Sequence, residues 1–481
     1  MHIAQRRLAW YKRCKRRAAP LNLSQPHRRY LEGVGAFLEL PKFTTDALFP
    51  IFIALLNDLI PIIDGTSVLC DYSNGQSSIF LTRAICLVTC KVKQARPFLY
   101  VADDGPLLTP PKFGSKLLSG LDAAMRADLE PDRLSKVQIL TMMHLHNDGI
   151  DGPGRSSSYL SQAIHEAWSL LLHWDIPGNE NQEQCDFLWW SLRNFDRLNK
   201  PIMGTTPFII DDSDIAIKRI LPRKDSYRSQ LMSLSMALGD LMVTATKVYK
   251  ATSAATSDDC RDFPSLEDLT STIDFSRLHK SHKGTFIFRR PNRLDIDGKL
   301  AYLEIWYHVA AMLSCRYNGP NTVQYQRRLR SADRILHLVS KVGDCLRPLP
   351  LVPYAMSMST TTIYRALRDN QRDPNAALQD LCACYSALLA LSQQWTSAKG
   401  VARLTKDLLR DFDRLRPMTK RPDHDVENTQ QRSMQKADSA LAAHTCSPGE
   451  RQCVMEVEDI GPRPVSMPAS VAIEKTILLR L

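Results

Sequence analysis

The sequence predicts an all-α protein, a large array of antiparallel helix pairs. Apolar residues recur at helical spacing along most of the body, as at Leu48, Phe52, Leu55, Leu56 and Leu59, which share one helix face. Clusters of turn formers separate such stretches, and only residues 285–288 alternate as a strand would. With 44% hydrophobic residues in 481, the chain can bury a substantial core.

The helices follow in order from this periodicity. The first begins after Thr44, Thr45 and Asp46, which can cap it. Further helices are predicted within residues 79–92, 112–129, 133–146, 157–173, 182–198, 230–249, 299–317, 323–342, 376–395 and 401–415. Breaks are predicted at 103–111, 147–154, 251–264, 289–298 and 348–353. Short breaks favour antiparallel packing of neighbouring helices.

The two ends differ from this body. The formal charge is +11, but residues 1–27 form a basic segment with no acidic residue. Its densest part contains Lys12, Arg13, Lys15, Arg16 and Arg17, a density typical of nuclear import or of phosphate contact. A solvated basic tail is the alternative. Residues 418–481 are predicted to be a polar, flexible tail, whose last apolar residues form either a partner contact or a frayed end.

No secretory or membrane-spanning segment is predicted. The basic start lacks a following apolar run, and the most apolar stretch, residues 47–63, is interrupted by Pro50, Asn57, Asp58 and Pro61. The twelve cysteines include no CxxC pair, which fits small apolar core residues in a reducing compartment. A soluble intracellular protein is expected.

Residues 136–222 carry a series of short motifs whose order is more specific than any one of them. The series begins with the helix at 136–145 and the helix at 159–164, which closes on His173 and Trp174. Trp189 and Trp190 follow, then Asp196 and Arg197. An exit segment contains Gly204, Pro207, Asp212 and Asp214.

This series resembles the middle homology, or regulatory, domain of fungal zinc-cluster (Zn2Cys6-type) transcription factors. Residues 29–37 and the apolar runs after them are similar to the start of the same domain, most like its cutinase-regulator branch, so the resemblance covers about residues 28–345. The chain departs from the family pattern at Thr205, where arginine is usual, and at Asp186 and Phe187, where a basic pair is usual.

The resemblance implies a helical regulatory domain over residues 28–417 and a nuclear regulator of transcription, controlling a specialised-metabolite or catabolic gene set. It implies partners in the transcription machinery or co-regulators, a small-molecule effector and a homodimer. A zinc cluster needs paired CxxC thiolates, and none is present. Zinc and base-specific DNA reading are therefore expected only if such a module lies upstream of this sequence; no other cofactor is expected.

An all-α metal-dependent enzyme is the alternative hypothesis. Asp211, Asp212 and Asp214 could supply oxygen ligands to Mg²⁺, although no second ligand cluster is evident, and aspartates after Gly204 and Pro207 are more typical of helix caps. No Gly-x-Ser-x-Gly elbow or phosphate loop is present, so enzyme activity is not predicted.

The remaining candidate residues have structural interpretations. His144 and His146 point to different sides of a helix, and Cys86 and Cys90 are expected to be buried thiols. Core packing is expected for the adjacent Trp189 and Trp190, one of which could line a cleft. Asp196 and Arg197 are expected to tie their helix to its neighbours through charge-assisted hydrogen bonds.

Overall fold

The computed structural model of the protein describes residues 2–16, 23–148, 152–203, 207–249, 263–271, 273, 278–280, 286–290, 293–295, 298–315 and 323–415. It is all-α, as predicted. The α-helices, in chain order, are α1 (His2–Lys15), α2 (Gln25–Gly33), α3 (Lys42–Leu55), α4 (Gly65–Ser73), α5 (Ile79–Thr89), α6 (Pro110–Arg126), α7 (Arg133–His146), α8 (Gly152–Ser169), α9 (Gln182–Met203), α10 (Tyr227–Tyr249), α11 (Leu266–Ser271), α12 (Gly298–Leu313), α13 (Val323–Val342), α14 (Leu351–Arg368), α15 (Pro374–Leu391) and α16 (Thr396–Leu415).

Minor elements complete the fold. The 3₁₀ helices are η1 (Lys93–Phe98) and η2 (Asp212–Asp214). A small antiparallel sheet joins β1 (Leu278–Lys280), β2 (Phe286–Arg290) and β3 (Arg293–Asp295), with Phe288 opposite both Leu278 and Asp295. Of the alternating residues 285–288, residues 286–288 form the start of β2, and residue 285 lies outside the described residues.

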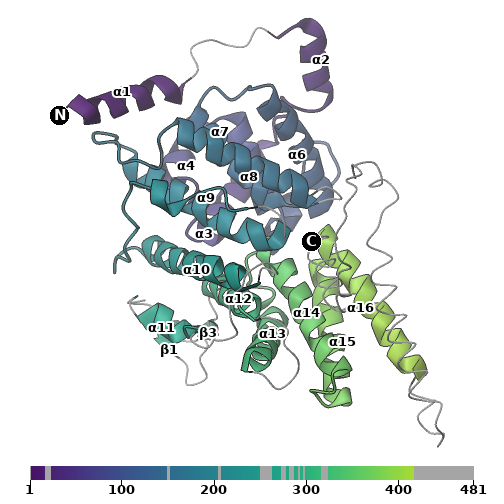
Figure 1. The fold of residues 1–481 in the computed structure, drawn as a ribbon. Coiled ribbons are helices and arrows are strands. Elements are labelled where there is room, and N and C mark those ends of the chain that lie inside the picture. Colours follow the sequence, from purple (N-terminus) through teal and green to yellow (C-terminus); the bar gives the residue numbers. More distant parts are fainter. Residues whose placement is uncertain are drawn as a thin grey trace, which may run out of the picture.

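Helices that follow one another along the chain pack together. Helix α7 packs on α8, α8 on α9 and α9 on α10, and the same holds from α12 through α16. Short connections make such neighbours antiparallel. In Figure 1, α3–α9 form the upper body and α13–α16 extend below it, while α10 lies between α9 and α12 and joins the two groups. Nearly all buried apolar residues belong to one continuous core.

Local sequence explains several helix ends. The side chains of Asp64, Ser78, Asp132 and Asp373 accept hydrogen bonds from N–H groups of the first turns of α4, α5, α7 and α15, as capping residues do. Helix α7 stops where Asn147 adopts a left-handed conformation with φ 31°. Among the described residues, no helix has the length and apolarity needed to span a bilayer.

The predicted break at 348–353 is confirmed for residues 348–350 and was wrong for its second half, because α14 begins at Leu351. Pro353 lies in its first turn, where a missing N–H breaks no intrahelical bond. Every residue from Leu351 to Leu367 is buried, so α14 has no polar stripe, and the helical period cannot be read from it.

Other helix bounds were wrong at their ends. Helix α8 begins at Gly152 and ends at Ser169, short of the predicted residue 173, because the chain turns where Leu171 adopts φ 60°. Helix α9 continues past the predicted 198 to Met203. Helix α12 stops at Leu313, before the predicted 317. The predicted flexible tail, residues 418–481, lies outside the described residues.

Candidate functional site

The motif series of residues 136–222 forms one consecutive block of helices. It contains α7, α8, α9 and the exit segment of residues 207–222, and α10 packs against α9 from the other side. Of the predicted motif residues, Gly204 lies outside the described residues, as does Thr205, and Pro207 is exposed at the start of the exit segment. Trp189, Trp190, Asp196 and Arg197 lie on α9, Asp212 contacts α9, and Asp214 is exposed.

Trp189 and Trp190 are both buried, as their placement on α9 predicts. The Trp189 ring, 0% exposed, packs on His173 and Trp168, with ring centroids 5.3 and 6.5 Å away. The indole N–H of Trp190 donates to the carbonyl of Lys218 at 3.0 Å. Each ring therefore fixes a different neighbour of α9, since Trp189 contacts the end of α8 and Trp190 the exit segment.

Asp196 and Arg197 hold the exit segment on α9. The Asp196 carboxylate accepts hydrogen bonds from the backbone N–H groups of Ile209 and Ile210 at 3.0 and 3.1 Å. Arg197 donates to Asp196 at 2.7 Å, to the carbonyl of Ile210 at 2.9 Å and to Asp212 at 2.8 Å. The pair thus binds an irregular segment rather than a neighbouring helix.

Arg193 completes this network, and the sequence interpretation missed it. Its side chain is fully buried and donates to Asp212 and, at 2.5 Å, to Asp240 of α10. A Cβ at position 239 would lie 2.7 Å from Arg193 Nη1, so Gly239 gives the guanidinium its space. The spacing of Arg193 to Asp196 and Arg197, at i, i+3 and i+4 on one helix face, is a signal that could have found it.

The electrostatics of the network fix its charge state. Burial opposes ionisation of Asp212, but the hydrogen bonds and charges of Arg193 and Arg197 outweigh it and lower the pKa of Asp212. Burial raises the pKa of Asp196, and the N–H groups of Ile210 and Ile209 offset part of that effect. The network of Arg193, Asp196, Arg197, Asp212 and Asp240 is called the arginine cluster below.

The aspartates of the enzyme hypothesis have different neighbours. Asp211 caps η2, accepting the backbone N–H of Ser213 at 2.9 Å. Asp212 belongs to the arginine cluster, and Asp214 is exposed. Across the described ranges, no group of three or more His, Cys, Asp or Glu side chains is placed to hold a metal ion.

The basic N-terminal segment forms α1, which packs on the body instead of extending as a tail over residues 2–16. Tyr11 of α1 is 3% exposed and lies 3.7 Å from the thiol of Cys185. Arg7 stacks over the Trp174 ring at 4.2 Å, and Trp10 donates to the carbonyl of Ser169.

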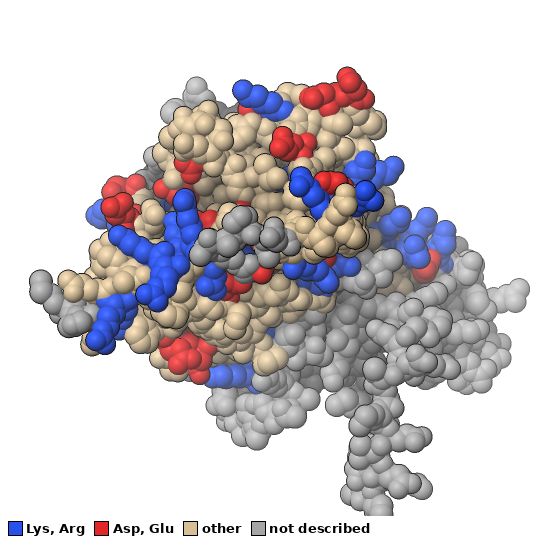
Figure 2. Space-filling model, turned by 90° about the horizontal axis from the view of Figure 1, so that it is seen from above, with Lys and Arg blue, Asp and Glu red and all other residues tan. Residues whose placement is uncertain are grey.

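The basic side chains of α1 divide into two sets. Lys15 pairs with Asp132 at 3.8 Å, whereas Lys12, Arg13 and Arg16 are exposed and Arg17 lies outside the described residues. Seen from above in Figure 2, lysines and arginines gather at the left of the molecule, the side where α1 lies in Figure 1. Helix α1 therefore fixes a basic surface on the body.

Cys86 and Cys90 are buried thiols, as expected, and His144 and His146 are both buried as well. Desolvation lowers the pKa of His144 to about 4, and its Nδ1 lies 3.0 Å from the carbonyl oxygen of Ser156. Burial also lowers the pKa of His146. Cys86 and Cys90 are both 0% exposed, and burial raises the pKa of each thiol.

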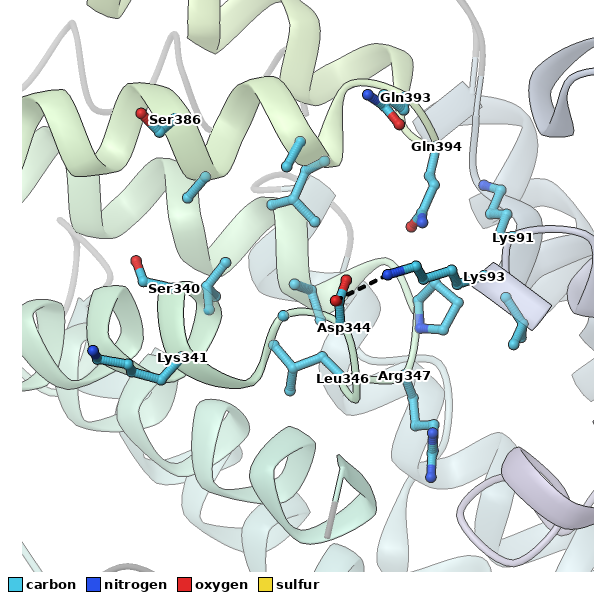
Figure 3. A pocket seen from close by; sticks show the side chains of 18 of the residues that line it. Lys91, Lys93, Ser340, Lys341, Asp344, Leu346, Arg347, Ser386, Gln393 and Gln394 are labelled. Atoms are coloured by element: carbon cyan, nitrogen blue, oxygen red, sulfur yellow. Dashed lines mark hydrogen bonds and ion pairs between the residues drawn. The ribbon is translucent and has the colours of Figure 1, made fainter. Parts of the chain in front are cut away.

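A cavity of about 730 Å³ is a second candidate site, and no sequence motif predicted it. Its walls come from three segments far apart in the chain: the end of α5 with η1, the turn between α13 and α14, and the second half of α15 with the residues after it. Figure 3 shows charged and amide side chains of all three segments around its opening.

Comparison with known proteins adds no further likeness. No protein-family model matches the chain, and no curated protein matches its sequence. The resemblance to the regulatory domain therefore depends on the motif residues of this chain alone.

Proposed function

We propose that the chain is a transcription regulator of fungal type that acts in the nucleus. It controls a specialised-metabolite or catabolic gene set through its helical regulatory domain. One observation supports the proposal most: the ordered motif series of residues 136–222, in which the buried Asp196 and Arg197 form one hydrogen-bonded network with the half-exposed Asp212. Three residues of a motif are then related by contact as well as by spacing.

The partners proposed are co-regulators or the transcription machinery. Lys12, Arg13 and Arg16 on α1 are exposed and suit an import receptor or nucleic-acid phosphates. Phosphate contacts of this kind position a protein on DNA but read no base sequence. Base reading is proposed to come from a separate module or from a partner.

The proposed mechanism is a population shift between two packings of the helices. An effector or partner that binds one packing more tightly increases its population by that difference in affinity. The arginine cluster holds the exit segment between α9 and α10, so a shift of α10 against α9 would change the exposure of this segment.

Transcript profiling of the host organism tests the regulatory role. The gene is deleted in one strain and over-expressed in another, and a defined gene set is expected to change in opposite directions. An unchanged transcriptome together with an altered metabolite would favour the alternative proposal, the metal-dependent enzyme.

The enzyme alternative has its own test in Asp211→Asn with Asp214→Asn. These substitutions leave Asp212 and the arginine cluster intact, so the fold is expected to survive. Regulation of the gene set is expected to persist in this variant, whereas loss of the biological output without loss of folded protein would support the aspartates as ligands.

The nuclear location is tested with a fluorescent fusion. Lys12→Gln, Arg13→Gln and Arg16→Gln together are expected to move the protein out of the nucleus. A matched control replaces three exposed lysines elsewhere, Lys42, Lys112 and Lys116, and is expected to leave it there. Equal nuclear signal in both variants would remove α1 as the import signal.

A further inference from the structure

The cavity between η1, the α13–α14 turn and α15 has a strongly positive lining. Five lining residues carry a positive charge, namely Lys91, Lys93, Arg96, Lys341 and Arg347, and one carries a negative charge, Asp344. Its volume of about 730 Å³ falls in the range of small-molecule sites, about 300–1,000 Å³. A concave surface lined by one sign of charge concentrates ligands of the opposite sign.

Lys93 and Arg96 are the groups best placed to contact an anion. They lie three residues apart on η1, and side chains at i and i+3 of a 3₁₀ helix project in the same direction. Both side chains line the cavity, so an anion bound there can contact an ammonium and a guanidinium group, which form charge-assisted hydrogen bonds.

Asp344 does not prevent an anion from using Lys93. The two side chains pair at 2.9 Å across the opening (Figure 3), but they are 57% and 81% exposed. Exposed ion pairs contribute little to stability, so an anion can replace the Asp344 carboxylate at low cost. Lys91 has a different role, because its ammonium group already contacts the carbonyl of His146 and the Trp395 ring.

The rest of the cavity suits an apolar body with a few polar atoms. Val339, Leu346 and Val352 line one wall, and Ala387 and Leu391 of α15 line another. Gln393 and Gln394 follow α15 near Lys93 in Figure 3, while Ser340 and Ser386 lie at the other end. An apolar wall with a few convergent polar groups is typical of sites for organic molecules.

We propose that this cavity binds one small organic anion, a carboxylate or a phosphate ester with an apolar body, whose anionic group contacts Lys93 and Arg96. The ligand would touch η1, the α13–α14 turn and α15 together, and so would hold the lower helices on the upper body. The site does not depend on the regulatory role, since binding is measured on the purified chain; if that role holds, the site is where an effector acts.

Binding is tested with three probes on the full chain by titration calorimetry. Octanoate and phenyl phosphate represent the two anion types, and octanamide is the neutral counterpart of octanoate. At least one anion is expected to bind with one-to-one stoichiometry, and if octanoate does so, octanamide binds at least tenfold more weakly. Which anion binds distinguishes a carboxylate from a phosphate ester. Failure of both anions to bind saturably at millimolar concentration would overturn the proposal.

Variants locate the site. Lys93→Gln with Arg96→Gln is expected to weaken binding of the anion at least tenfold, whereas Lys112→Gln with Lys116→Gln on α6 leaves it unchanged. Ala390→Phe, an exposed lining residue, narrows the cavity and should weaken binding without removing charge. Retained helical circular dichroism and a cooperative melt show that each variant is folded. Unchanged affinity in both cavity variants would place the anion elsewhere and overturn the proposal.

Discussion

The ammonium nitrogen of Lys91 lies 3.3 Å from the centroid of the Trp395 ring, and both side chains are 1% exposed. A buried cation over an aromatic face is attracted by the ring quadrupole, and the attraction is strongest with tryptophan. The contact joins the end of α5 to the start of α16, so it connects the upper body to the last helix pair. Asp148 reinforces it, accepting the backbone N–H of Thr396 at 2.8 Å.

Substitution of Trp395 tests how much this contact contributes. Trp395→Leu is expected to lower the free energy of unfolding by about 3 kcal/mol, since it removes both buried volume and the ring face. Trp395→Phe keeps an aromatic face, and the indole N–H has no partner to lose among the described residues, so it should cost about 1 kcal/mol. Urea unfolding measures both. Equal losses would show that the aromatic face itself contributes nothing.

Asp212 is expected to matter for stability far more than Asp214. Asp212→Asn leaves the buried Arg193 with Asp240 and weakens the hold of Arg197 on the exit segment. Because the Asp212 side chain is 49% exposed, we expect a loss of about 1–2 kcal/mol, less than the roughly 3–5 typical when a fully buried pair is broken. Asp214→Asn is the control and should cost under about 0.5 kcal/mol. Equal melting temperatures would contradict a stabilising arginine cluster.

Replacing glycine by alanine should have opposite effects on stability at Gly298 and Gly400. A Cβ at Gly298, the first residue of α12, would lie 1.8 Å from the carbonyl oxygen of Cys345, and something would have to shift. Gly298→Ala is therefore expected to destabilise the fold by about 2 kcal/mol or more. Gly400 lies in α16 with nothing within 4 Å, so Gly400→Ala should stabilise it by about 0.5–1 kcal/mol. Differential scanning calorimetry measures whether each variant melts at a lower or a higher temperature than the unchanged protein.

Acidification should destabilise the protein through His144. Its pKa is about 4 in the folded chain against 6.5 for the free side chain, so the unfolded chain binds the proton first. Its contribution is fully present above pH 6.5 and is lost as the pH falls towards 4, at about 1.4 kcal/mol per pH unit. His144→Gln should reduce the loss of unfolding free energy between pH 6.5 and 5. An unchanged pH slope would show that His144 titrates normally.

Tyr11 is expected to fix α1 on the body. Tyr11→Ala removes the deeply buried side chain of that helix, while Arg7 over Trp174 and the Trp10 hydrogen bond remain. Hydrogen exchange of the α1 amides should then speed up at least tenfold, with little change in α12–α16. Lys12→Ala, at an exposed position of the same helix, is the control. Equal exchange in the two variants would mean that α1 does not depend on Tyr11.

The sequence predicted most of the helices, including α5, α7 and α12, which are buried almost all round, but it missed others. Helix α13 was predicted with its observed bounds because polar residues interrupt its apolar face at regular intervals. Helix α14 was missed because the prolines near its start indicate a break, and α1 because its dense basic residues indicate a solvated segment. Local patterns contain no information about which distant surface will cover a helix.

In the candidate sites, the sequence predicted some of the residues that form polar contacts but not their distant partners. Adjacent Asp196 and Arg197 predicted charge-assisted bonds, and these exist, but their partners on the exit segment and the contribution of Arg193 followed only from the structure. The cavity could not be predicted, because Lys93, Asp344 and Gln394 come from segments far apart in the chain. Nuclear regulation and the metal-dependent alternative stay predictions.

The contact between Lys91 and Trp395 can form only late in synthesis of the chain. A ribosome adds about 5–20 residues per second, so Trp395 emerges roughly tens of seconds after Lys91. During that interval the helices of the upper body can pack together, but the Lys91 ammonium lacks the Trp395 ring that later covers it. Chains that end before α16 would therefore leave this amine without its ring and Asp148 without the N–H of Thr396.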